Sequence, residues 1–178
     1  MSEVVGLARI FDDDVNVGVL ERRLSPSVAA YAEVLASDRA WSFTTLMQAS
    51  GDRAKQIARE LPAGPGREEL CGDVAFWMEV LAELTGTTQI GVRLARLEAP
   101  MCPALHVDKV TVRIVSTYTG PGTEWMERGS LRRCHEGDVV LLKGERWPKN
   151  EGRGAVHRSP PNDATSRPRV LLTLDPLA

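Results

Sequence analysis

Residues 106–118 read HVDKVTVRIVSTY, a run in which β-branched side chains follow a His-x-Asp pair. Valine, isoleucine and threonine favour extended backbone, so this run predicts a β-strand. Side chains two positions apart on an extended chain project to the same side, so His106 and Asp108 can reach one point in space. The run therefore predicts a strand with two metal-binding side chains at its start.

A further histidine, His157, lies much later in the chain. His106, Asp108 and His157 together supply two imidazoles and one carboxylate, the donor set that leaves open positions on a divalent iron. We predict that these three residues, called the triad below, bind one divalent metal ion. The alternative is a non-catalytic interaction module in which the presence of these three residues is coincidental.

Four more segments after residue 89 predict short strands. They alternate apolar with polar residues or are rich in β-branched residues, and proline and glycine turns separate them. These segments are 90–97, 139–142, 155–157 and 169–175. Many short strands without helical spacing between them indicate a sandwich or a jelly roll.

The first part of the chain predicts helices instead. Apolar residues recur there at helical spacing, with a Ser25-Pro26 start signal and Gly86 as a C-terminal cap. One predicted helix begins at Ser25. Three more cover 39–49, 52–61 and 67–84. We therefore predict an α+β fold in a single domain, 1–178, with a mainly helical support layer (1–88) packed on one sheet of a jelly-roll metal-binding core (89–178).

Composition excludes several classes of function. The 178 residues carry a net charge of −2, which gives no basic surface for nucleic acid. No apolar run is long enough to span a bilayer, and the first residues lack the pattern of a signal peptide. Three widely spaced cysteines fit a reducing compartment. We expect a cytoplasmic protein without nucleic-acid or membrane partners, and the sequence leaves the oligomeric state and the substrate open.

The order of these residues resembles that of the iron(II)/2-oxoglutarate-dependent dioxygenases. In that superfamily a His-x-Asp…His triad holds iron in a cupin-like jelly roll, and a basic residue beyond the distal histidine binds the far carboxylate of 2-oxoglutarate. Here Arg169, followed by Thr173 in the last predicted strand, matches that basic residue. The resemblance implies Fe²⁺ on the triad, 2-oxoglutarate on Arg169, and hydroxylation of an unknown substrate.

Two other residues are candidates near the cosubstrate. Tyr118 has the same parity as His106 and Asp108, so an unbroken strand would point its hydroxyl toward the same cavity. An ordinary buried tyrosine is the alternative. Arg167 competes with Arg169 for the carboxylate, but it precedes Pro168 and is expected in a turn.

Over nearly its whole length the chain resembles the bacterial DUF1826 family. Three long runs carry this resemblance: MCPALHVDKVTVRIVSTYTGPGTEW, GDVVLLKGERWPKNEGRGAVHRSPP and RVLLTLD. Some members are encoded near zinc-homeostasis genes, which implies Zn²⁺ as the alternative metal in a cupin-like protein of metal homeostasis. A thiolate from Cys102 would favour zinc, whereas a merely packed Cys102 would leave iron preferred.

Overall fold

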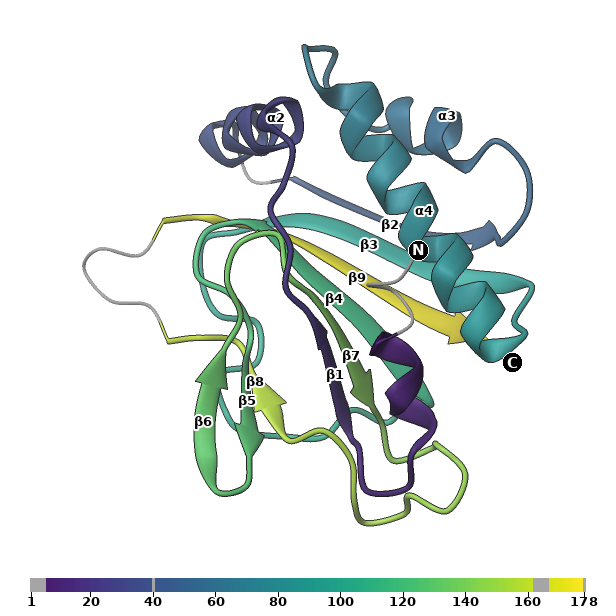
Figure 1. Cartoon of the computed structure of the whole chain (residues 1–178). Helices are drawn as coiled ribbons and strands as arrows, with labels where there is room; N and C mark the ends of the chain where they lie inside the picture. Colours follow the sequence, from purple (N-terminus) through teal and green to yellow (C-terminus); the bar gives the residue numbers. More distant parts are fainter. Residues whose placement is uncertain (1–5, 40, 162–166, 178) are drawn as a thin grey trace.

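The computed structural model describes residues 6–39, 41–161 and 167–177 (Figure 1). A six-stranded antiparallel sheet has the order β1-β7-β4-β9-β3-β2, and a three-stranded antiparallel sheet has the order β6-β5-β8. The strands of the large sheet, in that order, are Val17–Leu20, Val139–Lys143, Val112–Thr119, Arg169–Leu177, Gln89–Leu97 and Ser42–Gln48. Those of the small sheet are Ser130–Arg133, Glu124–Glu127 and His157–Arg158.

Helices pack on one face of the large sheet. They are the 3₁₀ helix η1 (Gly6–Phe11), α2 (Pro26–Ser37), α3 (Arg53–Ala58) and α4 (Arg67–Thr85). Figure 1 shows α2 and α4 lying across this face, and side chains of both helices share a core with β4 and β9. Within the described residues, no helix combines the length and apolarity that a bilayer crossing needs.

Sequence signals explain where the two long helices begin and end. Ser25 caps α2 by accepting a hydrogen bond from the Val28 amide, and Pro26 occupies the first turn, as predicted. Gly86 ends α4 in a left-handed conformation, and its amide bonds the Ala82 carbonyl. The helices predicted over 52–61 and 67–84 are confirmed as α3 and α4.

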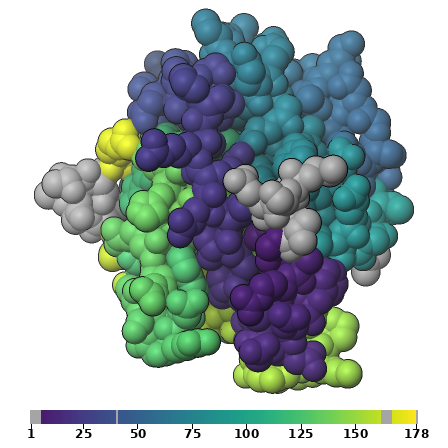
Figure 2. All heavy atoms as spheres, viewed as in Figure 1, coloured from purple at the N-terminus to yellow at the C-terminus, as the bar shows by residue number. Residues whose placement is uncertain are grey.

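The opposite face of the large sheet is partly covered by the small sheet. Val115 of β4 and Leu171 of β9 pack there with Trp125 of β5 in a second, smaller apolar core. In the space-filling view, the segment from η1 through β1 lies on the surface beside the hairpin β5–β6 (Figure 2). Because side chains alternate along a strand, successive residues of β9 face the helices and the small sheet in turn.

Part of the predicted helical layer is wrong. The helix predicted over 39–49 is replaced by a strand, because β2 spans Ser42–Gln48 and pairs with β3 over its whole length. Strand β1 also falls before residue 89, so the first half of the chain supplies both edge strands of the large sheet as well as the helices.

The hairpin β5–β6 was not predicted either. Its turn has positive φ at Arg128 (49°) and Gly129 (81°), the conformation of a tight hairpin turn.

Candidate metal centre

The triad residues come together as the sequence predicts. One ligand atom from each of His106, Asp108 and His157 lies within 4.8 Å of the other two. The Nε2 atom of His106 is 3.6 Å from Asp108 Oδ1, and that of His157 is 3.3 Å from Asp108 Oδ2. Two metal–ligand bonds of about 2 Å span about 4 Å at most, so both histidine–aspartate separations fit a shared ion.

A backbone bridge joins the two histidines. The amide of His106 donates to the carbonyl of His157 at 3.0 Å, and the reverse bond measures 2.9 Å. Each ring is also fixed: Nδ1 of His106 lies 2.9 Å from the Ala104 carbonyl, and Nδ1 of His157 lies 2.8 Å from the Ala155 carbonyl. A carbonyl oxygen only accepts, so each Nδ1 carries a proton, and each Nε2 is the ring atom that faces the Asp108 carboxylate and can bind a metal.

Arg113 keeps the carboxylate of the triad charged and oriented. Its Nη1 donates to Asp108 Oδ2 at 2.7 Å, while Nε and Nη2 donate to the two oxygens of Asp175 at 2.7 and 2.8 Å. Burial by itself raises the pKa of Asp108, but the contact with His157 and the charge of Arg113 outweigh it and lower the pKa. An ionised carboxylate can bind a cation without first losing a proton.

A glycine brings the loop after β7 against the loop that carries Asp108. The amide of Gly144 donates to the Thr111 carbonyl at 2.8 Å, and that of Glu145 donates to the Asp108 carbonyl at 3.0 Å. A Cβ atom on Gly144 would lie 2.0 Å from the Val110 carbonyl oxygen, so a side chain cannot be placed there without moving the backbone. This close approach fixes the backbone from which the Asp108 carboxylate projects.

Arg169 is buried, and no acidic residue that the structure describes pairs with it. It is 3% exposed, and its Nη2 donates to the hydroxyls of Thr117 at 3.4 Å and Thr123 at 3.3 Å. Among the described residues, its Nε and Nη1 atoms have no hydrogen-bond partner. Burial lowers the pKa of Arg169 to about 10. An unpaired buried guanidinium is costly, so this arrangement favours an anion that completes it.

Arg169 lies on the face of the large sheet that carries the smaller core. Val170 and Leu172 point toward the helices, whereas Leu171 contacts the small sheet, so Arg169 shares the side of Leu171. Thr117 of β4 pairs with Leu171. The small sheet that faces this side carries His157 on β8. The Arg169 guanidinium therefore lies on the face of the large sheet that the small sheet covers, and the small sheet carries His157 of the triad.

The structure turns Tyr118 away from this space, so the predicted orientation of its side chain is wrong. Its hydroxyl donates to Asp73 of α4 at 2.6 Å, within the helix-side core. The parity argument required an unbroken strand from His106, but that residue sits at an isolated bridge, and β4 begins only at Val112. Thr117 and Thr119 are also separated by an irregularity in the pairing with β9.

The two competing candidates lie outside the cluster. Arg167 is exposed and forms ion pairs with Glu33 and Glu136 on the surface. Cys102 is exposed, and in the described part of the chain it is not one of the residues grouped around a common metal position. Arg169 is thus the buried arginine of the pair, and the candidate donor set contains no thiolate.

Glu124, which the sequence did not single out, supports the strand that carries His157. Its buried carboxylate accepts hydrogen bonds from Arg158 Nε at 2.7 Å and Arg133 Nε at 2.9 Å. Burial acts to raise the pKa of Glu124, but the hydrogen bonds and charges of the two arginines outweigh it and lower the pKa. Because Arg158 directly follows His157, these ion pairs fix the backbone of a triad residue.

We expect Glu124→Gln to lower the free energy of unfolding by about 1–3 kcal/mol at neutral pH, because two guanidinium groups lose their charged partner. A carboxyl with a depressed folded pKa stabilises the fold above its unfolded pKa, about 4.3, and this contribution is lost as the pH falls through the folded pKa. Urea unfolding at several pH values should therefore show the difference from wild type shrinking below about pH 4.

Glu127→Gln is the matched control for that measurement. Glu127 lies on the same strand but is exposed and pairs with Arg132 at the surface, so we expect a change near zero. A difference between Glu124→Gln and wild type that stays constant from neutral to acidic pH would contradict the role given to the Glu124 charge.

The sequence comparison places the chain in a family. Residues 2–175 match the family described as "Protein of unknown function (DUF1826)". The chain belongs to the DUF1826 family. No curated protein matches the sequence of this DUF1826 member.

Solved structures resemble this DUF1826 fold over nearly the whole chain. A dioxygenase for auxin oxidation in rice is 14% identical, with a TM-score of 0.60, over 98% of this chain and 78% of that one. A prolyl-4-hydroxylase of Pseudomonas putida is 10% identical, with a TM-score of 0.53, over 97% and 96% of the two chains. A Neurospora crassa protein in complex with alpha-KG and 5-formyluracil is 13% identical, with a TM-score of 0.52, over 98% and 76%. At these identities the likeness shows a shared fold, here one found in oxygenases.

Proposed function

We propose that this protein is an iron(II)- and 2-oxoglutarate-dependent oxygenase with a jelly-roll core, in which the triad binds the metal and Arg169 binds the cosubstrate. One observation carries the proposal: a buried guanidinium, with two nitrogen atoms unpaired among the described residues, lies on the face of the large sheet that is covered by the small sheet, which carries His157 of the three-donor cluster. The likeness to oxygenases supports it at the level of the fold.

The donor set suits iron(II). Two imidazoles whose Nε2 atoms face one ionised carboxylate supply the ligands of the facial triad, and three protein ligands leave positions open for a cosubstrate. Zinc accepts the same donors, but a thiolate from Cys102 would be the feature that favours it, and Cys102 does not join the described cluster. Iron is therefore the metal that we propose.

The cosubstrate chemistry suits Arg169. 2-Oxoglutarate carries a carboxylate at each end, so one end can bind the metal while the other pairs with a guanidinium fork. The hydroxyls of Thr117 and Thr123 lie beside the guanidinium and can donate to the same carboxylate.

The protein residues around these groups have separate tasks. Bound iron would supply the activation of oxygen, which side chains do not provide. Arg113 holds Asp108 in its ionised form, and the two backbone carbonyls hold the imidazoles in the metal-binding tautomer. The apolar side chains of Val115 and Leu171 pack with Trp125 between the sheets and would help to exclude water from the site.

Anaerobic titration of the metal-free protein with Fe²⁺ and then 2-oxoglutarate tests the proposal. We expect a visible charge-transfer band at one equivalent of each, and on admission of oxygen a conversion of 2-oxoglutarate to succinate and carbon dioxide. Zinc-loaded protein should show neither signal. Stoichiometric zinc that survives dialysis, together with no band from iron, would favour the alternative of a zinc-binding protein in metal homeostasis.

A further inference from the structure

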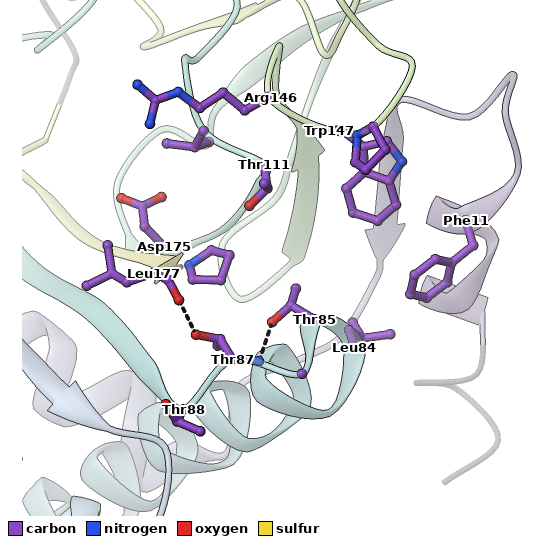
Figure 3. A pocket seen from close by; sticks show the side chains of 14 residues that line it. Phe11, Leu84, Thr85, Thr87, Thr88, Thr111, Arg146, Trp147, Asp175 and Leu177 are labelled. Carbon is purple, nitrogen blue, oxygen red and sulfur yellow. Dashed lines mark hydrogen bonds between the residues drawn. The ribbon is translucent and has the colours of Figure 1, made fainter.

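A cavity lies at one end of the large sheet. It encloses about 860 Å³ between the end of α4, the end of β9 and the loop after β7 (Figure 3). Its walls are mostly apolar and include Phe11, Leu84, Trp147 and Leu177. A volume of this size and an apolar lining with few polar groups are typical of sites for small molecules.

The aromatic wall of this cavity is held in place. The Trp147 ring lies 5.5 Å from the Phe11 ring, and the Lys143 ammonium lies 5.0 Å from the centre of the Trp147 ring. Lys143 is buried and donates to the Asp12 carbonyl at 3.0 Å, so it cannot move away without losing that bond. A fixed ring loses little freedom when a ligand packs on it, which favours binding of a flat apolar group.

The charges at the cavity are unequal. Asp175 lines it, but both of its carboxylate oxygens accept hydrogen bonds from Arg113. Arg146 also lines the cavity and is exposed, and its guanidinium has no hydrogen bond or ion pair to any residue that the structure describes. The charge left without a partner at this cavity is therefore positive.

We propose that this cavity binds a small aromatic carboxylate, with its ring against Trp147 and its carboxylate on Arg146. The site is distinct from the proposed 2-oxoglutarate pocket, since neither the triad nor Arg169 lines it. It is connected to the metal centre through Asp175, which lines the cavity and accepts hydrogen bonds from Arg113, the partner of Asp108. Binding there requires neither iron nor 2-oxoglutarate.

Three ligands of similar shape and different charge test the proposal: 2-naphthoate, 2-naphthalenemethanol and 2-naphthylmethylamine. Calorimetric titration of each into the metal-free full chain should show saturable binding, with the carboxylate about fivefold tighter than the alcohol. Arg146→Gln should reduce the affinity for naphthoate to that for the alcohol. Arg153→Gln, which changes an exposed arginine of the same loop, should leave the order unchanged.

Two further measurements distinguish this cavity from the pocket around Arg169. Trp147→Ala should weaken the binding of all three ligands, and thermal unfolding would verify that the variant is folded. An excess of 2-oxoglutarate should not displace naphthoate, and Arg169→Gln should retain its binding. Displacement by 2-oxoglutarate, tightest binding of the amine, or no saturable binding of any ligand would each overturn the proposal.

Discussion

Replacing His157 with alanine is expected to weaken the binding of Fe²⁺ or Zn²⁺ by about 100-fold or more, because one of only three protein donors is removed. The remaining pair, His106 and Asp108, cannot complete the site. Competition against a chromophoric chelator gives the dissociation constant, and metal analysis after dialysis gives the stoichiometry. His106→Ala should have an effect of the same size.

The third histidine of the chain provides a matched control. His135 has a side chain that is 87% exposed, and its carboxylate neighbour, Asp138, is not part of the triad. We expect His135→Ala to bind metal as wild type does. If His157→Ala and His106→Ala also kept wild-type metal content, the histidine cluster would have no metal-binding role, and a non-catalytic interaction module would be the better description.

Arg169→Gln is expected to weaken the binding of 2-oxoglutarate to the iron-loaded protein by about 100-fold, because the far carboxylate loses its charged, two-pronged partner. The affinity for iron itself should not change, since Arg169 is not a metal ligand. Anaerobic titration followed through the visible charge-transfer band measures both quantities. Arg169→Lys should give an intermediate affinity, because it keeps the charge but not the fork.

Arg167→Gln is the control for this experiment. Arg167 lies two positions away but is exposed and already paired with Glu33 and Glu136, so its loss should leave cosubstrate binding unchanged. If Arg169→Gln bound 2-oxoglutarate as tightly as wild type, the buried guanidinium would need another anion, and the proposed oxygenase would lose its main support.

The sequence predicted the triad because donor chemistry and local geometry are readable from residue types. It could not show the bridge between His106 and His157, since that pairing depends on how β8 is placed against the loop before β4. The preference for Arg169 over Arg167 rested on strand position, and the structure does place Arg169 inside. Tyr118 shows the limit of the same reasoning, because parity holds only along a continuous strand.

The missed strands have physical reasons. In β2, Phe43, Leu46 and Met47 are spaced as on a helix face, but pairing with β3 overrides that local preference. Exposure does alternate along this edge strand, but Thr45 faces inward and Leu46 is exposed, so the apolar-polar alternation of the sequence is weak. The strands of the hairpin β5–β6 are short and rich in charged residues, so they lack the apolar alternation that indicates a strand. Because β5 was not predicted, the sequence did not reveal that Glu124 supports the strand of His157.

The two backbone hydrogen bonds between His106 and His157 bring the metal donors together only in the folded chain, so metal binding can be used to follow folding. In the unfolded chain only His106 and Asp108 are neighbours, so high affinity must wait until two distant segments have closed on each other. A slip of one residue in that pairing would turn an imidazole to the wrong side and remove the third donor. The time course of metal capture during refolding should therefore mark the closure of the chain between these two residues.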